Sequence, residues 1–168
     1  SYEHMSLSNS NNIASNHRNH NKIAVCGHSG YIHILDGQRK TWLMDLKMNT
    51  GVRSVTFKDD YHIVTSGVDA SVYIWDIRMS NRCIQRYINE DGTSSSAMVC
   101  GGGGGGSSSN NNGCLAIGSE SGVVSLYDTV NTTNTTTNNY YNTTPYKTVM
   151  NLTTEISSLA LHSNNQLL

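Results

Sequence analysis

The sequence predicts an all-β protein in which a four-stranded antiparallel unit is repeated, with about three units and the start of a fourth. Three observations support this prediction. Segments of the chain align with one another, the Asp residues that close those segments recur at a regular spacing, and the middle strands carry apolar residues on both faces. Repetition with a period of about 20 to 50 residues indicates an architecture built by stacking similar units.

Three aligned segments each predict a β-hairpin. They are KIAVCGHSGYIHILD (22–36), HIVTSGVDASVYIWD (62–76) and CLAIGSESGVVSLYD (114–128). Each has an apolar run, a polar turn that contains Gly, a second apolar run and a closing Asp, as expected for two antiparallel strands joined by a short turn. The closing residues Asp36, Asp76 and Asp128 are 40 and 52 residues apart, and removal of the 12-residue tract GGGGGGSSSNNN (101–112) restores a spacing of 40.

Two further strands are predicted for each unit, one before the hairpin and one after it. The leading strands are EHMSL (3–7), GVRSVTF (51–57), TSSSAMV (93–99) and EISSLAL (155–161). The trailing strands are KTWLMDL (40–46), RCIQRYI (82–88) and YKTVMNL (146–152). Four short antiparallel strands repeated about every 40 residues are typical of the blades of a β-propeller.

The blade boundaries follow from this repeat. They are 1–48 for the first blade, 49–90 for the second, 91–154 for the third and 155–168 for the start of a further blade. Three low-complexity tracts fall between strands: an Asn-rich loop at 8–21 and inserts at 101–112 and 130–144. Loops tolerate such insertions because each doubling of loop length costs only about 0.6 kcal/mol. The chain begins with Ser1, and we expect it to be part of a longer protein.

Burial of the middle strands on both faces is the physical basis of the stacking. VYIW (72–75) and VVSLY (123–127) do not alternate strictly between apolar and polar residues, which favours strands sandwiched between neighbouring blades. Burial of one such Ile or Val contributes roughly 1.5–3 kcal/mol. Propellers typically close a ring with about 4–8 blades. We therefore expect the terminal blades of this chain to expose apolar faces.

The unit resembles a degenerate form of the WD repeat. The second unit closes on Trp75-Asp76, whereas the first and third close on Asp36 and Asp128 without a Trp. Asp69 stands in the hairpin turn where WD repeats place a structural Asp. The Gly-His pair expected before the first strand is replaced by NTG (49–51), so the usual His partner of this Asp is absent. The resemblance implies structural WD-type roles for these Asp and Trp residues.

A narrower resemblance extends over most of the chain. GHSGYIHIL (27–35), DASVYIWDIRMSNRCIQRYINEDG (69–92), CLAIGSESGVVSLYD (114–128) and YKTVMNLTTEISSLALHSNNQLL (146–168) resemble successive stretches of the U3 small nucleolar RNA-associated protein 18 family. The last two stretches are the strongest part of this resemblance, because a basic residue followed by VMNL and then SSLAL is unusual among WD repeats. The low-complexity inserts depart from the family pattern and fall between strands.

This resemblance implies a non-catalytic scaffold subunit of the small-subunit processome, the nucleolar particle that assembles on nascent pre-ribosomal RNA with the U3 small nucleolar RNA. The expected partners are the other propeller subunits of the UTP-B subcomplex, the U3 ribonucleoprotein and the pre-ribosomal RNA particle. The expected role is processing towards 18S ribosomal RNA. No membrane, small-molecule substrate or cofactor is expected.

The residues themselves predict no catalytic, metal or cofactor site. The glycine tract lacks the Gly-Lys-Ser/Thr of a phosphate-binding loop, and the four cysteines show no CxxC spacing. His17 and His20 form HxxH without a further ligand at a suitable spacing. The net charge of −1, from 11 basic and 12 acidic residues, gives no sign of a nucleic-acid binder. Arg78, Arg82 and Arg86 could form a small basic patch, but a solvated strand edge is the simpler interpretation.

Two alternative functions remain open. One is a generic WD-repeat adaptor for protein interactions outside ribosome assembly, because propellers host many functions. The other is an enzyme or a secreted glycoprotein built on a propeller. The glycosylation sequons at Asn131, Asn134, Asn142 and Asn151 would matter only after secretion, and catalysis would require ionisable groups that converge in one pocket.

Overall fold

A computed structural model of the chain describes residues 2–7 (backbone only), 22–59, 61–79, 83–89, 91–101, 114–129, 144–149 and 153–160. The Asn-rich loop and nearly all of the two inserts lie outside these residues. The described strands form three four-stranded antiparallel sheets. Each sheet keeps its strands in chain order, so every connection within a sheet joins neighbouring strands.

The strands lie close to the segments that the sequence predicts. The first sheet contains β1 (Tyr2–Leu7), β2 (Lys22–Gly27), β3 (Tyr31–Asp36) and β4 (Thr41–Lys47). The second contains β5 (Val52–Phe57), β6 (His62–Gly67), β7 (Ser71–Asp76) and β8 (Cys83–Ile88). The third contains β9 (Ser95–Gly101), β10 (Cys114–Ser119), β11 (Val124–Asp128) and β12 (Lys147–Val149).

The three central hairpins share one register. In each of them the first residue of the second strand of the sheet pairs with the closing Asp. The pairs are Lys22 with Asp36, His62 with Asp76 and Cys114 with Asp128. The alignment of the three sequence segments is therefore also an alignment in structure.

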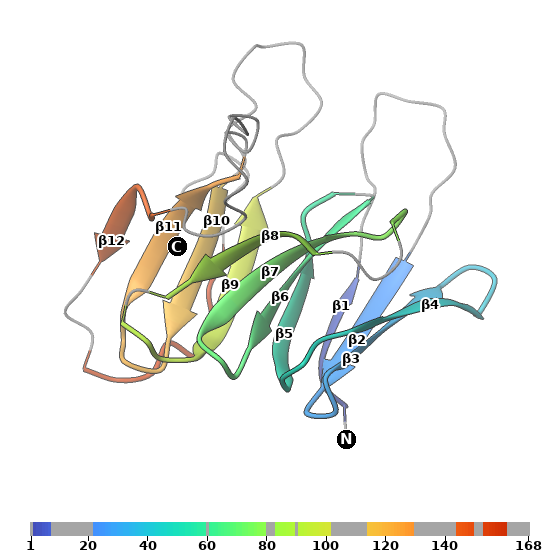
Figure 1. Cartoon of the computed structure of the whole chain (residues 1–168), viewed down its shortest axis with the longest axis horizontal. Helices are drawn as coiled ribbons and strands as arrows, with labels where there is room; N and C mark the ends of the chain where they lie inside the picture. Colours follow the sequence, from blue (N-terminus) through green and yellow to red (C-terminus); the bar gives the residue numbers. More distant parts are fainter. Residues whose placement is uncertain are drawn as a thin grey trace, which may run out of the picture.

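The sheets fan out around their first strands (Figure 1). β5 packs against β1 on one side and against β9 on the other, whereas the last strands β4, β8 and β12 make no comparable contacts with one another. This arrangement of neighbouring sheets is that of blades in a β-propeller, and it confirms the predicted all-β propeller fragment.

Two apolar clusters join the sheets. The first lies between the first and second sheets and includes Ile32, Ile34, Val55, Ile63 and Trp75. The second lies between the second and third sheets and includes Val64, Ile74, Tyr87, Leu115 and Tyr127. The second sheet thus contributes both of its faces to the core, which is why β6 and β7 are apolar without strict alternation.

The outer face of the third sheet is covered by residues 153–160 and not by a strand. The sequence predicts a strand at 155–161, but the structure gives no strand to residues 155–160. Ile156 nevertheless packs on Ala97 and Val124, and its backbone N–H donates to the Ser119 carbonyl at 3.2 Å. A leading strand pairs with the second strand of its own sheet, and no such pairing of 155–160 occurs among the described residues. The predicted strand is therefore wrong for these residues, and the start of a further blade stays a prediction.

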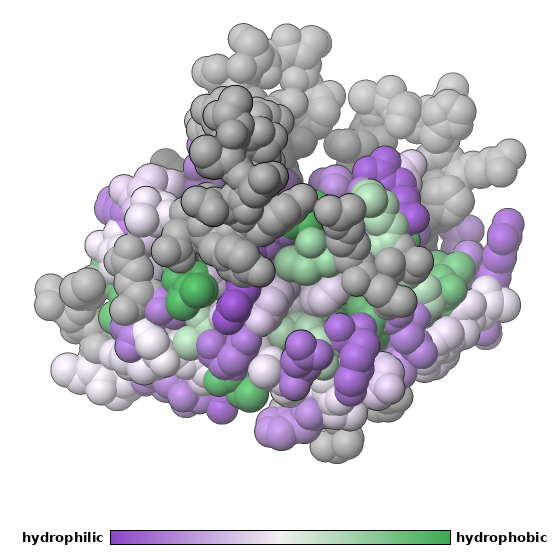
Figure 2. Space-filling model, viewed as in Figure 1, coloured by the Kyte–Doolittle hydropathy of each residue, from purple (hydrophilic) through white to green (hydrophobic). Residues whose placement is uncertain are grey.

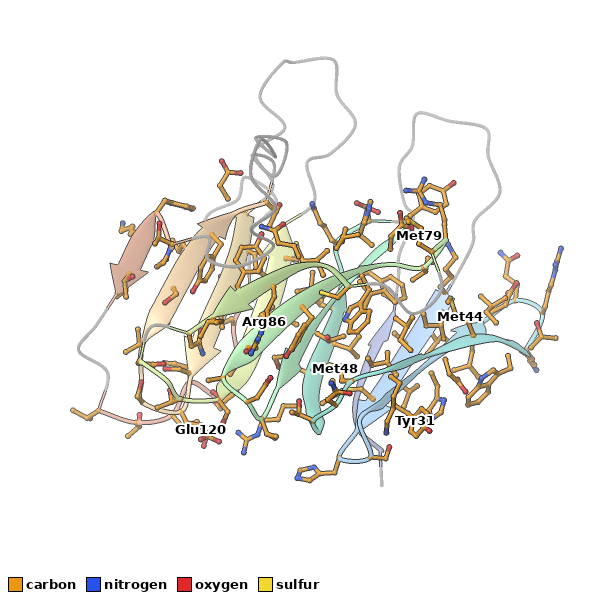
Figure 3. The ribbon with its side chains drawn as sticks, in the orientation of Figure 1. Tyr31, Met44, Met48, Met79, Arg86 and Glu120 are labelled. Carbon is orange, nitrogen blue, oxygen red and sulfur yellow. The ribbon has the colours of Figure 1, made fainter. Side chains whose placement is uncertain are left out.

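The strand connections separate the molecule into two ends. We call one the insert end: it holds the connections β1–β2, β3–β4, β5–β6, β7–β8, β9–β10 and β11–β12, which include all three low-complexity tracts. The other is the turn end, with the short connections β2–β3, β4–β5, β6–β7, β8–β9 and β10–β11. Met79 and Glu120 mark the insert end and the turn end in Figure 3.

Candidate interaction surface

Asp69 lies in the turn between β6 and β7 and bonds to side chains of its own sheet. Its Oδ2 accepts a hydrogen bond from the Tyr73 hydroxyl at 2.6 Å and lies 3.5 Å from the Arg86 guanidinium. Arg86 also donates to the Ser71 hydroxyl at 2.6 Å. Burial, together with the bond to Asp69, raises the pKa of Tyr73 to about 12. The phenol therefore stays protonated at neutral pH and can donate to Asp69.

Trp75 is buried in the cluster between the first and second sheets. Its indole Nε1 donates to Thr65 Oγ1 at 2.9 Å, and the Thr65 hydroxyl donates to Met48 Sδ at 3.3 Å. Met48 follows β4 and is itself buried; Figure 3 shows it near the connection between β4 and β5. A thioether, and not a histidine, therefore lies next to this Trp–Thr pair.

The Asp residues that close the hairpins lie at the insert end. Asp36 Oδ1 accepts hydrogen bonds from the backbone N–H groups of Gln38 and Arg39 at 2.9 and 3.0 Å. Asp76 Oδ1 accepts in the same way from the backbone N–H of Arg78 at 2.9 Å. Such bonds fix a turn by satisfying backbone donors that the strands leave unpaired. Asp128 occupies the equivalent register position in the third sheet.

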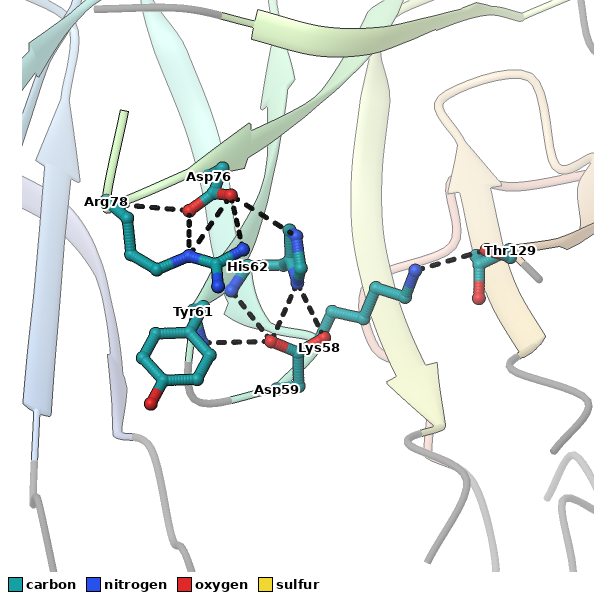
Figure 4. Close-up of polar contacts among 7 residues, drawn as sticks. All are labelled: Lys58, Asp59, Tyr61, His62, Asp76, Arg78 and Thr129. Carbon is teal, nitrogen blue, oxygen red and sulfur yellow. Dashed lines mark hydrogen bonds and ion pairs between the residues drawn. The ribbon is translucent and has the colours of Figure 1, made fainter. Parts of the chain in front are cut away.

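A polar cluster surrounds Asp76 (Figure 4). The Arg78 guanidinium donates to both Asp76 oxygens, at 2.6 Å for the shortest bond. These bonds lower the pKa of Asp76 to about 2. His62 Nδ1 lies 2.7 Å from Asp59 Oδ2, and its Nε2 lies 3.8 Å from Asp76. The imidazole thus links the carboxylates of two neighbouring turns.

The same cluster contacts both neighbouring sheets. Lys58 Nζ donates to the Thr129 carbonyl of the third sheet at 3.1 Å. The Tyr61 ring has the Arg78 guanidinium 4.6 Å from its centre and Lys22 Nζ of the first sheet 5.3 Å away. Tyr61 remains 48% exposed. The insert end of the second sheet is therefore an ordered surface of cations and an accessible aromatic ring.

A second exposed group lies on β3 and β4. The His33 ring lies between Tyr31, with centroids 6.0 Å apart, and Trp42, with centroids 4.6 Å apart. Asp45 accepts from Trp42 Nε1 at 2.7 Å and contacts His33 Nδ1 at the same distance. Trp42 is 53% exposed although its N–H is held in place. This aromatic row lies on the face of the first sheet that points away from the second sheet, because the alternate residues Ile32 and Ile34 pack towards the second sheet.

Hydrophilic side chains dominate much of the surface in Figure 2, with smaller hydrophobic areas between them. Within the described ranges, no three His, Cys, Asp or Glu residues are grouped so that they could hold a metal ion. In the same part of the chain, no helix has the length and apolar character that crossing a membrane requires. His17, His20, Arg82 and the four sequons lie outside the described residues.

Sequence reasoning singled out Asp69, Trp75 and Asp76 but missed the residues that contact them. Thr65 and Met48 are 10 and 27 residues before Trp75 in the sequence, and no motif links them to it. The sequence allowed a small basic patch of Arg78, Arg82 and Arg86, with a solvated strand edge as the simpler interpretation. The structure instead places Arg78 and Arg86 in separate networks, with Asp76 at the insert end and with Asp69 at the turn end. The signal that could have separated the two arginines was the acidic residue with which each of them pairs.

The fold and the repeated hairpins define the class of protein: this is a fragment of a WD-type β-propeller. Similarity to a chain in the crystal structure of the Mitotic Checkpoint Complex agrees with this fold, with a TM-score of 0.65 and 16% identity over 83% of this chain and 37% of the other. No family model matches the chain.

Curated relatives identify the family. The chain is 31% identical over 149 residues to a U3 small nucleolar RNA-associated protein 18 homolog of Arabidopsis thaliana. It is 29% identical to the human homolog over 147 residues and to the Saccharomyces cerevisiae protein over 166. These alignments cover 87–89% of this chain. These similarities support the U3 small nucleolar RNA-associated protein 18 family for this chain, which spans about a quarter of the length of these relatives (24–27%).

Proposed function

We propose that this chain is part of a non-catalytic scaffold subunit of the small-subunit processome. The observation that carries the proposal is the similarity to U3 small nucleolar RNA-associated proteins along 87–89% of the chain, from plant, animal and yeast sources. Within this proposal the protein associates with the U3 ribonucleoprotein in the nucleolus, belongs to the UTP-B subcomplex and supports maturation of 18S ribosomal RNA.

The geometry suits a scaffold. Three sheets joined by two apolar clusters form a rigid body, and their turns and edge strands offer large surfaces to partners. The ionisable groups around Asp76 are engaged with one another in turns. Binding through such preformed surfaces requires no reactive group, and we assign none.

The direct test is to tag the full-length protein in its own cells and to purify it under native conditions. We expect nucleolar fluorescence, U3 RNA enriched at least tenfold over an unrelated small nuclear RNA, and propeller subunits of UTP-B among the co-purified proteins. Depletion should lower 18S relative to 25S or 28S ribosomal RNA. A tagged protein that is excluded from the nucleolus and lacks U3 RNA would contradict the proposal.

The generic-adaptor alternative is favoured only by the fold, which many WD-type proteins share. The same purification distinguishes it, because an adaptor that acts elsewhere would recover other partners and no ribosome-assembly proteins. A protein that enters the nucleolus but lacks UTP-B subunits would retain the role in ribosome assembly and refute the assignment to this subcomplex.

A further inference from the structure

The fold separates charges that the sequence distributes evenly. At the insert end the described residues include six cations and four carboxylates: Lys22, Arg39, Lys40, Lys58, Arg78 and Lys147, with Asp36, Asp59, Asp76 and Asp128. At the turn end they include three cations and four carboxylates: Lys47, Arg53 and Arg86, with Asp69, Asp91, Glu120 and Glu155. Among the described residues, the insert end thus has two more cations than carboxylates, and the turn end has one more carboxylate than cations.

Three of the four carboxylates of the insert end accept hydrogen bonds from the backbone of their own turns. Asp36 accepts from two N–H groups of its turn. Asp59 accepts from the N–H groups of Tyr61 and His62, both at 2.9 Å, and Asp76 from that of Arg78. Their negative charge is therefore partly balanced by fixed dipoles within the turns.

Four of the six cations of the same end are exposed, whereas Lys22 and Lys58 are half-buried. The Arg39 side chain is 79% exposed, and its nearest ion-pair distance, to Asp36, is a long 3.9 Å. Lys40 beside it is also exposed, at the corner of the β3–β4 turn where its φ is 54°. The Arg78 side chain is more than half exposed although it pairs with Asp76. Arg39 and Lys40 are therefore available to an anion that approaches this end, whereas the charge of Arg78 is balanced by Asp76.

Exposed tyrosines accompany the cations. Tyr61 lies between Lys22 and Arg78, as described above, and Tyr146 is 61% exposed directly before Lys147 at the start of β12. Lys58, between these two places, bridges the second and third sheets through the Thr129 carbonyl. Cations and aromatic rings along one groove or surface are the combination that binds single-stranded nucleic acid, since phosphates meet the cations and bases stack on the rings.

We propose that the insert end of the fan, through Arg39, Lys40, Lys58, Tyr61 and Tyr146, binds single-stranded RNA. This inference rests on the proposed function, which brings the protein to an RNA-containing particle, and it names the surface that meets the RNA. The turn end has no such excess of cations, since Arg53 and Arg86 are paired with Glu120 and Asp69. The binding is electrostatic and sequence-tolerant, because the surface presents charges and ring faces and not an array of base-specific donors.

The test uses the purified full-length protein and a fluorescein-labelled 20-nucleotide polyuridylate RNA, with the Kd measured by fluorescence anisotropy at several KCl concentrations. The variant is Arg39→Gln/Lys40→Gln, which removes two exposed charges from a surface turn. Loss of two phosphate contacts should reduce the slope of log K against log salt by about 1.4, equivalent to roughly 25-fold weaker binding at 0.1 M salt. The matched control is Lys47→Gln/Arg53→Gln, which removes two charges from the turn end and should leave the Kd within about twofold.

A second readout locates the contact in the assembled particle. Ultraviolet cross-linking of cells that express the tagged full-length protein, followed by mass spectrometry, should find nucleotide adducts on peptides that contain Tyr61 or Tyr146. Equal Kd values for the variant and the control, or adducts confined to other parts of the protein, would overturn the proposal. Protein cross-links at this end without RNA adducts would also overturn it, in favour of a protein partner.

The two proposals fail in different ways. If the protein recovers U3 RNA from cells but gives no adducts at the insert end, the proposed function stands and the RNA-binding surface is refuted. A protein that recovers no U3 RNA refutes the proposed function itself, whatever its affinity for polyuridylate.

Discussion

The indole N–H of Trp75 donates to the hydroxyl of Thr65 across the β6–β7 pair, at 2.9 Å and in a fully buried position. The two residues belong to the face of the second sheet that packs on the first sheet. The contact lies within the second sheet and gives the buried indole N–H an acceptor inside an apolar cluster, so a change that removes it leaves a buried donor unpaired.

We expect Thr65→Val to destabilise the protein by about 1–3 kcal/mol, because it leaves the buried Trp75 N–H without an acceptor. The free energy of unfolding in urea, measured on the full-length protein, checks this. Thr65→Ser keeps the hydroxyl and should therefore lower the free energy of unfolding by less than Thr65→Val does. In a double-mutant cycle, Trp75→Phe should remove most of the extra cost of Thr65→Val; additive losses would contradict a direct coupling.

Asp76→Asn should make stability less dependent on pH. The Arg78 guanidinium lowers the pKa of Asp76 from 3.8 to about 2. Because the folded-state pKa is the lower one, the carboxylate stabilises the fold above about pH 4, and this contribution is lost as the pH falls to about 2. The wild type should exceed Asp76→Asn in unfolding free energy at pH 7, and the difference should shrink between pH 4 and pH 2. Parallel pH profiles would argue against the ion pair.

Gly118→Ala should loosen residues 153–160 from the third sheet. A Cβ at Gly118 would lie 2.5 Å from Ile156 Cγ2 and 2.7 Å from Ile156 Cβ, so one of the two segments must move. Overpacking of this kind typically costs about 1–3 kcal/mol. Limited proteolysis should cut the segment faster in the variant. Ile156→Ala, added to Gly118→Ala, removes the γ-carbon nearest to the new Cβ. The double variant should therefore have a higher free energy of unfolding than Gly118→Ala alone. An equal or lower value would show that the strain lies elsewhere.

The ion pair between Arg53 and Glu120 joins the second and third sheets at the turn end, where both side chains are partly exposed. We expect a small coupling, about 0.2–1 kcal/mol, because exposed charges stay solvated. Arg53→Glu and Glu120→Arg should each lower the free energy of unfolding slightly. The double variant, in which the two charges are exchanged, should recover this loss. A coupling that persists unchanged in 1 M salt would contradict this view of a screened surface pair.

Most of the strand pattern could be predicted from the sequence. The hairpins 22–36, 62–76 and 114–128 occur in the predicted places because apolar runs around a Gly-containing turn leave few alternatives to antiparallel pairing. The segment 155–160 shows the limit of this reasoning. It has a strand-like pattern, but a strand also needs a partner for its backbone groups, and local sequence does not specify one.

The candidate site was predictable only in part. Asp69 and Trp75 were identified by their places in the repeat, whereas Thr65 and Met48 were missed. Thr65 reaches Trp75 across the β6–β7 hairpin, and Met48 joins them from the end of β4 through packing between sheets. The basic insert end was also missed, because the net charge of −1 conceals it.

The sequence by itself determined the repeated unit, its four strands, their order and the propeller class, because these depend on periodicity and turns that act over a few residues. Only the tertiary structure decided which side chains meet between sheets and how charge is divided between the two ends. The physical reason is that alternate connections of an antiparallel sheet return to the same end, so Lys22, Lys58 and Lys147 gather there from turns far apart in the chain.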